Sequence, residues 1–260
     1  MLAVDRLTRS FSGLVAVDDV SFRVAPHTVH ALIGPNGAGK TTLFNVVSGL
    51  LAVSGGSIHF QGIDITRLSA HRCAALGMGR TFQNLRVFGE MTVLENVLTG
   101  MHPRLGEAWP WTVLRLPAAR AEERAAQDKA GALLEMVGIA DHARRPAADL
   151  AYGDQRRLEI ARALAAEPAL LLLDEPAAGM NPTKTAALGE LLQVLKGRGL
   201  TILLVEHDMS FVMRLSDRLT VLNFGKKIAE GAPDAIRADP EVVEAYLGPR
   251  VARRLLQEAM

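Results

Sequence analysis

The 260-residue chain has little of several features that would direct its function elsewhere. It holds a single cysteine, Cys73, so no internal disulfide framework can form, and a reducing compartment is indicated. Aromatic residues make up only 5% of the sequence, which disfavours a base-stacking surface for single-stranded nucleic acid. The 29 basic and 28 acidic side chains nearly cancel, so charge indicates neither a nucleic-acid partner nor an anionic membrane surface.

Long hydrophobic runs are also missing, although 49% of the residues are hydrophobic, enough for a well-cored globule. No apolar run reaches the roughly 18–20 residues that span a bilayer. The N-terminal residues Met1–Arg6 lack the apolar segment of a secretory signal peptide. We therefore expect a soluble, cytoplasmic protein that can still dock on a membrane protein.

A glycine-rich phosphate-binding pattern stands out among the features that are present. It runs over residues 34–42 as Gly34, Pro35, Asn36, Gly37, Ala38, Gly39, Lys40, Thr41 and Thr42. The apolar run Val29–Ile33 predicts a buried strand before it, and Thr42–Ser48 predicts a helix after it. Such a loop directs several backbone N–H groups and the positive end of a helix dipole toward one point. We therefore expect a nucleoside triphosphate there, with Lys40 on its phosphates and the Thr41 hydroxyl as a Mg²⁺ ligand.

Two further apolar runs end in polar residues that suit phosphoryl transfer. Leu170–Leu173 is followed by Asp174 and Glu175. In a P-loop protein, an acid at the end of a buried strand predicts a Mg²⁺ ligand, here Asp174, and Glu175 would then deprotonate the attacking water. Thr201–Val205 leads to His207, which can hydrogen-bond the γ-phosphate or that water. The alternative for His207 is an ordinary capping residue before the next helix.

The order of the predicted elements indicates an α/β fold. Alternation in the first thirty residues and at Ser57–Phe60 predicts an antiparallel β layer. Residues 86–165 predict helices at Arg120–Val137 and Gln155–Leu164, with an irregular proline- and tryptophan-containing segment before them. The tail, Pro240–Met260, also predicts a helix. The later strand-helix-strand order requires a mostly parallel sheet that includes the P-loop strand.

Two more segments are ambiguous from their residues alone. Gln83 has an amide oxygen that can reach Mg²⁺ and an amide group that can hold a water, although glutamines are common on protein surfaces. Gly153 lies where a loop opens into a helix. Its backbone donors there can bind a second anion, or the glycine can simply begin the helix.

The chain resembles the nucleotide-binding subunit of ABC transporters over essentially its whole length. The resemblance rests on five segments in chain order: residues 34–42, Gln83, residues 150–155, residues 170–175 and His207. The resemblance implies an α/β, RecA-like P-loop NTPase with a mostly parallel sheet, an antiparallel β subdomain and an inserted helical subdomain. It implies a single domain over 1–260, with 1–85 and 166–260 as the catalytic core and about 86–165 as the helical subdomain that carries the signature motif.

The resemblance also implies roles for residues at matching positions. Gln83 falls at the Q-loop, where it would join Thr41 and Asp174 around Mg²⁺. Glu175 falls at the catalytic glutamate and His207 at the switch histidine. The implied enzyme is an ATPase that binds ATP and Mg²⁺.

Two of these subunits would sandwich two ATP molecules, each between one P-loop and the partner's signature loop. Here that loop is Ala151, Tyr152, Gly153 and Asp154, where the family usually has Ser-Gly-Gly-Gln. Ala151 has no hydroxyl, so the contact across the dimer must rest on backbone N–H groups such as that of Gly153. Asp154 adds negative charge near a phosphate and should lower ATP affinity unless a cation offsets it. Phe11 falls where the family has an aromatic that stacks on adenine, although a lone aromatic is more often a core residue.

Three stretches are similar to the ATPase subunits of branched-chain amino-acid importers, namely Arg80–Phe88, Leu150–Arg162 and Glu175–Pro182. The ending Val243–Gly248 resembles the longer of the two ATPases in such importers. This implies a peripheral subunit on the cytoplasmic face of the inner (plasma) membrane. Its partners would be a second nucleotide-binding subunit and integral permease subunits, one of which would place a helix near residues 83–90.

Three alternatives differ in substrate or in role. The chain could serve a related urea or amide importer, or act mainly as an ATP-gated regulatory subunit of a heterodimer. A soluble ABC ATPase that works on DNA or ribosomes is disfavoured, because the sequence lacks a coiled-coil insertion, a second cassette and basic patches. No nucleic-acid partner is therefore expected.

Overall fold

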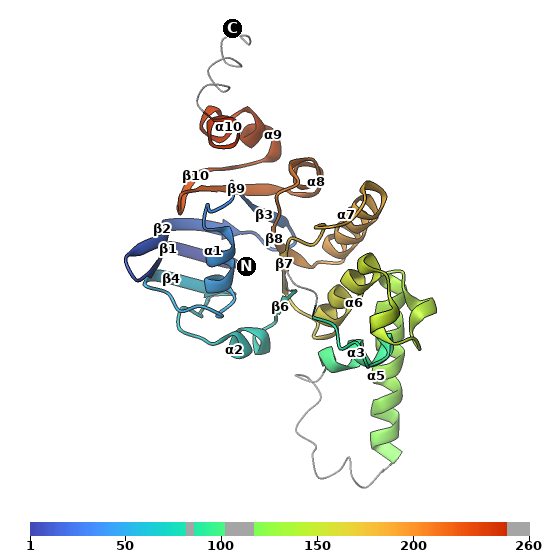
Figure 1. Ribbon diagram of the computed structural model, residues 1–260. Coiled ribbons are helices and arrows are strands. Elements are labelled where there is room, and N and C mark those ends of the chain that lie inside the picture. The colour runs from blue at the N-terminus through green and yellow to red at the C-terminus, as the bar shows by residue number, and fades with distance from the viewer. Residues whose placement is uncertain (82–85, 102–116, 249–260) are drawn as a thin grey trace.

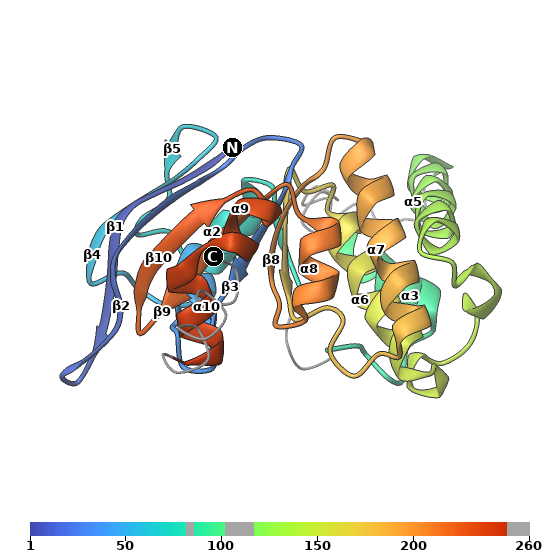
Figure 2. The same cartoon turned by 90° about the horizontal axis from the view of Figure 1, so that it is seen from above.

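Two β-sheets carry the phosphate-binding loop in the computed structural model, which describes residues 1–81, 86–101 and 117–248 (Figures 1 and 2). The smaller sheet is antiparallel, in the order β2-β1-β4-β5: β1 (Leu2–Phe11), β2 (Leu14–Val24), β4 (Gly55–Phe60) and β5 (Ile63–Asp64). The larger sheet has the order β10-β9-β3-β8-β7-β6: β3 (Val29–Ile33), β6 (Met78–Arg80), β7 (Leu170–Asp174), β8 (Thr201–Val205), β9 (Arg218–Asn223) and β10 (Lys226–Gly231). Its neighbours are parallel except β9 and β10, which confirms the predicted mostly parallel sheet and antiparallel layer.

The central strands β3, β7 and β8 are buried at every residue, as expected for parallel strands with both faces covered. Alternate residues of these strands point into two separate hydrophobic cores. Leu171 and Leu173 belong to the core that contains the helices after β6, whereas Leu170 and Leu172 belong to the core beside the antiparallel sheet. Helix α1 (Lys40–Val47) fills this second core between the two sheets.

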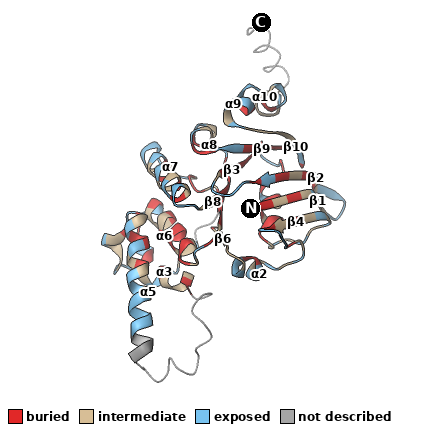
Figure 3. Ribbon diagram, turned by 180° about the vertical axis from the view of Figure 1, so that it is seen from behind, coloured by how far each residue is buried: buried red, intermediate tan, exposed pale blue. Residues whose placement is uncertain are grey.

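The remaining helices lie mainly on the other face and beyond the sheet edge (Figures 1 and 3). Their bounds are α2 (Ala70–Ala75), α3 (Val93–Met101), α5 (Pro117–Met136), α6 (Tyr152–Ala165), α7 (Pro182–Gly197), α8 (Met209–Leu215), α9 (Pro233–Ala238) and α10 (Pro240–Leu247). Short 3₁₀ turns occupy Ala140–His142 and Ala147–Asp149. Helices α3, α5 and α6 pack on one another, and Figure 3 shows a largely exposed outer face on α5. None of the helices in the described ranges has the length and apolar character needed to cross a bilayer.

Two predicted helices begin earlier than expected. The helix predicted from Thr42 begins at Lys40, after Gly39 in the left-handed conformation. The helix predicted from Gln155 begins at Tyr152, after Ala151, which provides no side-chain cap and so no usual start signal. Gln83, the proline- and tryptophan-containing segment at 102–116 and the tail beyond Gly248 lie outside the described residues.

Candidate functional site

The phosphate-binding loop is held between two strands by backbone contacts that leave no room for side chains. Gly34 has φ +149°, and a Cβ there would lie 2.1 Å from the carbonyl oxygen of Leu222 on β9. Gly39 has φ +96°, and a Cβ there would lie 2.4 Å from the carbonyl oxygen of Ala16 on β2. Both backbone conformations favour glycine. Since Gly39 precedes α1 without a side-chain cap, the first N–H groups of that helix remain available to an anion.

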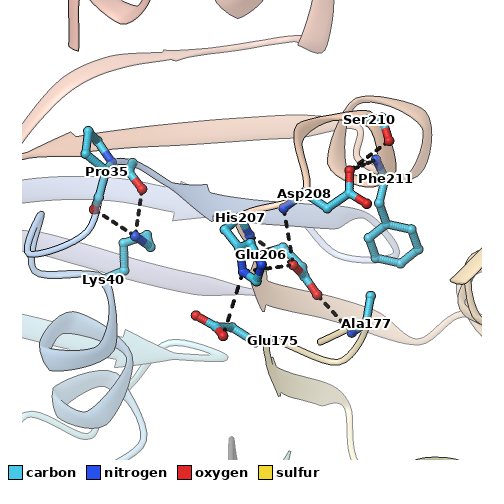
Figure 4. A network of polar contacts seen from close by, with 10 residues as sticks. Pro35, Lys40, Glu175, Ala177, Glu206, His207, Asp208, Ser210 and Phe211 are labelled. Carbon is cyan, nitrogen blue, oxygen red and sulfur yellow. Dashed lines mark hydrogen bonds and ion pairs between the residues drawn. The ribbon is translucent and has the colours of Figure 1, made fainter. Parts of the chain in front are cut away.

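Lys40 lies inside this loop (Figure 4). Its Nζ donates hydrogen bonds to the carbonyl oxygens of Gly34 at 2.7 Å and Pro35 at 2.9 Å. Burial lowers the pKa of the ammonium group, and the nearby Glu175 carboxylate acts in the opposite direction. The loop therefore combines backbone donors with a partly desolvated cation, the arrangement that a polyphosphate requires.

The carboxyl ends of β7 and β8 place the predicted acids and histidine at one edge of the sheet. Asp174 pairs with Val205, and the N–H of Glu175 donates to the Val205 carbonyl at 2.9 Å. Strand β3, which leads into the phosphate-binding loop, pairs in parallel with β8. The loop, the acids and His207 therefore follow neighbouring strands at the same edge, as the strand order predicts.

Glu175 and His207 face each other across this edge (Figure 4). His207 Nδ1 lies 3.7 Å from Glu175 Oε2. Glu175 has φ +47°, a conformation that non-glycine residues rarely adopt and that is enriched at functional sites. The capping alternative for His207 is wrong, because Asp208 caps α8 by accepting the Phe211 N–H at 3.1 Å.

Asp174 is the buried acid of the site, with 3% of its surface exposed. Burial raises the pKa of its carboxyl group, and the Arg80 guanidinium, 3.4 Å away, acts in the opposite direction. Asp174 and the Thr41 hydroxyl are hard oxygen donors, which Mg²⁺ prefers. Within the described ranges, no group of three or more His, Cys, Asp or Glu side chains could enclose a metal by itself. This donor set fits a Mg²⁺ that is held jointly by one or two protein oxygens and nucleotide phosphates.

Two residues of the site were not singled out from the sequence. Glu206, at the end of β8, is 1% exposed, and its carboxylate accepts the N–H of Ala177 at 2.8 Å and of His207 at 2.9 Å. It thereby ties together the loops that carry Glu175 and His207 (Figure 4). The other is Arg80, at the end of β6. The only signal for Glu206 in the sequence is that a charged residue follows an apolar strand, and Arg80 has no such signal.

The loop Ala151–Asp154 packs on the segment that follows Glu175. A Cβ on Gly179 would lie 3.3 Å from Cε1 of Tyr152, and a Cβ on Gly153 would lie 3.1 Å from Nζ of Lys184. Gly153 is buried, with the Lys184 side chain against it. Within the part of the chain that the structure describes, no hydrogen bond or ion pair joins Ala151–Asp154 to residues 34–42.

Phe11 lies at the end of β1 with 37% of its surface exposed. The guanidinium carbon of Arg9 lies 4.4 Å from the centre of its ring, which covers one face. The ring is thus a surface aromatic and not part of either core, and its stacking on adenine stays a prediction.

Comparison with known families decides the classification. The family model described as "ABC transporter" matches residues 17–178, which is well over half of the chain. The chain belongs to the ABC transporter family. A second model, described as "Branched-chain amino acid ATP-binding cassette transporter", matches residues 226–248 of this ABC cassette. That match covers β10, α9 and α10.

Curated relatives and solved structures extend over nearly the whole ABC cassette. The "High-affinity branched-chain amino acid transport ATP-binding protein LivG" of Salmonella typhimurium is 47% identical, covering 95% of this chain and 98% of its own length. The corresponding protein BraF of Pseudomonas aeruginosa is 46% identical over 95% of this chain and 98% of its own length. The crystal structure of a nucleotide-free ATP-binding cassette from an ABC transporter superposes with a TM-score of 0.83 at 33% identity, covering 96% of this chain and 99% of that one. The ADP conformation of an ATP-binding cassette gives a TM-score of 0.83 at 34% identity, with 96% and 99% covered.

Proposed function

We propose that this chain is the ATP-binding and ATP-hydrolysing subunit of an ABC importer for branched-chain amino acids. The observation that carries the proposal is the convergence of Lys40, Asp174, Glu175 and His207 at one sheet edge. The convergence provides a phosphate cradle, a metal-side carboxylate and a candidate base within one site. The substrate class rests on relatives at 46–47% identity that are named for branched-chain amino-acid transport, and on the match at residues 226–248.

The residues would divide the chemistry as follows. Lys40 and the N–H groups of the loop hold the β- and γ-phosphates. Thr41 and Asp174, with Gln83 from outside the described residues, would hold Mg²⁺, which neutralises charge on the phosphates when bound. Glu175 takes a proton from the attacking water, and His207 orients that water or contacts the γ-phosphate.

Two copies, or this chain and a second ATPase, would complete each site across a dimer interface. The lack of a hydrogen bond or ion pair between Ala151–Asp154 and residues 34–42 in the described part of the chain supports this arrangement. Lys184 lies against Gly153 and makes no hydrogen bond or ion pair through its ammonium group to any described residue. We propose that it supplies the cation that offsets Asp154 when a phosphate approaches the loop.

A groove of about 580 Å³ lies where the permease would dock. Its lining includes Arg80, Phe88 and Arg162, and it adjoins the chain on both sides of residues 82–85. The Phe88 ring is half exposed, and the Arg162 guanidinium lies 5.4 Å from its centre. An apolar ring beside cations suits the end of a short permease helix, since helix carboxyl termini carry partial negative charge. The helices of residues 86–165 would then move as one subdomain on the cytoplasmic face of the membrane.

The decisive experiment is Glu175→Gln, with Glu190→Gln on the exposed face of α7 as a matched control. ATP binding should persist in Glu175→Gln, because Lys40 and the loop N–H groups are untouched. Turnover should fall by roughly 10² or more, since the general base is lost. Wild-type turnover in Glu175→Gln, measured by phosphate release, would overturn the assignment of the base.

The altered signature loop favours one alternative, a mainly ATP-gated subunit of a heterodimer. Ala151 is exposed and has no hydroxyl with which to contact a phosphate. Phosphate release by the purified chain alone, abolished in Lys40→Ala, would support the proposal. Activity that appears only after a second ATPase is added would support the alternative.

A further inference from the structure

We propose that Arg80 is a positioning residue that fixes the Asp174 carboxylate relative to α1 and thereby strengthens Mg²⁺ binding in the nucleotide complex. The inference rests on the proposed function, because it concerns the Mg²⁺ that Thr41 and Asp174 would hold. Arg80 contacts the Asp174 carboxylate, so its action on a metal held there would be indirect.

The contacts of Arg80 reach two elements at once. Its Nη2 donates to Asn45 Oδ1 at 2.7 Å, and its Nη1 donates to the Ser48 hydroxyl. Its guanidinium carbon lies 4.8 Å from the centre of the Phe44 ring. Phe44 and Asn45 belong to α1, and Ser48 is the residue that caps its carboxyl end. The same Nη2 lies 3.4 Å from Asp174 Oδ2 at the end of β7.

The two expected metal ligands sit on the elements that Arg80 joins. Thr41 is in the first turn of α1, and Asn45 follows it by one helical turn. Asp174 ends β7, which pairs with the Arg80 strand, β6. A shift of α1 against β7 would change the separation of Thr41 and Asp174, and the planar guanidinium resists that shift because it is held at both ends.

The distances indicate that α1 anchors Arg80 and that Asp174 is the group being positioned. The contact with Asn45 is 2.7 Å, whereas the contact with Asp174 is 3.4 Å. The longer contact leaves carboxylate lone pairs for a metal. Residues that orient a metal ligand in this way commonly change metal affinity by about 10–100-fold when they are removed.

The test uses Arg80→Met in a Glu175→Gln background, where ATP stays bound. ATP binding would be followed by calorimetry in a Mg²⁺ titration and separately in EDTA. We expect the half-saturating Mg²⁺ concentration to rise about tenfold. Binding in EDTA should change less than twofold, because Lys40 and the loop N–H groups are intact. Arg72→Met on the neighbouring α2 is the matched control and should alter neither.

Two further variants keep the proposal falsifiable if Arg80→Met folds poorly. Asn45→Ala keeps the Arg80 charge and removes its anchor, so it should shift Mg²⁺ dependence in the same direction. Added to Arg80→Met it should cause no further shift, because both changes break one linkage. Arg80→Lys should be intermediate, since an ammonium group cannot reach Asn45, Ser48 and Asp174 together.

The outcomes separate this inference from the proposed function. A wild-type Mg²⁺ dependence in Arg80→Met, or no effect of Asn45→Ala, would overturn the positioning role while leaving ATP hydrolysis intact. An equal loss of binding in EDTA and in Mg²⁺ would also overturn it, because the effect would then not involve the metal. Failure of the parent protein to bind ATP at all would instead overturn the proposed function.

Discussion

Glu206 provides the sharpest test of how the sheet edge that carries Glu175 and His207 is held together. Glu206→Gln preserves the shape of the side chain and changes only one oxygen to an amino group. In the native protein, Oε1 accepts the Ala177 N–H and Oε2 accepts the His207 N–H. A glutamine can accept only one of these bonds, and its amino group then faces the other N–H. The substitution must therefore break either the Ala177 bond, which ties the Glu175 loop to β8, or the His207 bond, which fixes the turn that follows β8.

The size of the effect follows from the kind of bond that is lost. A hydrogen bond to a charged acceptor contributes about 1.5–3 kcal/mol. Glu206 is 1% exposed, so solvent has little access to its carboxylate. For a chain of this size that corresponds to a fall in Tm of roughly 3–12 °C. Turnover should fall as well, because the tied loops carry Glu175 and His207. ATP affinity should change little, since the phosphate-binding loop is not among the partners of Glu206.

The assay is thermal unfolding by circular dichroism together with phosphate release under saturating ATP. Glu190→Gln, an exposed change of the same type on α7, serves as the control for charge removal. A Tm within about 1 °C of the wild type, with unchanged turnover, would refute the reasoning. It would mean that the two N–H groups find other partners or that the loops need no common anchor.

Two further predictions concern a buried histidine and the signature loop. Burial lowers the pKa of His30 to about 4. The Glu230 carboxylate raises this pKa, whereas the charges of Arg218 and Lys227 lower it further. The His30 contribution to the free energy of unfolding, measured in urea, should therefore be complete above pH 6.5 and fall by about 3 kcal/mol toward pH 4. His30→Gln should remove this pH-dependent loss. Lys184→Met, which keeps the stem over Gly153, should raise the half-saturating ATP concentration up to about fivefold while Lys184→Arg does not. An unchanged half-saturating ATP concentration in Lys184→Met would contradict the proposal that the Lys184 charge offsets Asp154.

Local patterns were sufficient for the parts of the site that depend on backbone geometry. The glycine-rich pattern predicted a loop between a strand and a helix, and the structure places residues 34–39 between β3 and α1. The apolar runs before Asp174 and His207 predicted parallel strands, and both strands are present. These features are encoded by neighbouring residues, so a single sequence reveals them.

Tertiary contacts account for what the sequence did not reveal. Arg80 meets Asp174 across 94 positions of the chain, and Ala177 meets Glu206 across 29. Nothing near Arg80 in the sequence distinguishes it from a surface arginine. Asp208, and not His207, caps α8, a choice between adjacent polar residues that only the hydrogen bond of Asp208 with Phe211 decides.

The edge strand β6 has a mechanical consequence. It comprises only Met78–Arg80, and the described part of the sheet gives it one neighbour, β7. The ladder continues for one more bond, from the Thr81 N–H to the Leu172 carbonyl. A force on the chain beyond Thr81 therefore has few hydrogen bonds to break before it reaches Arg80. Strand β3, in contrast, is hydrogen-bonded to β9 on one side and to β8 on the other. The larger sheet is thus compliant at the margin next to the proposed permease groove and stiff where the phosphate-binding loop begins.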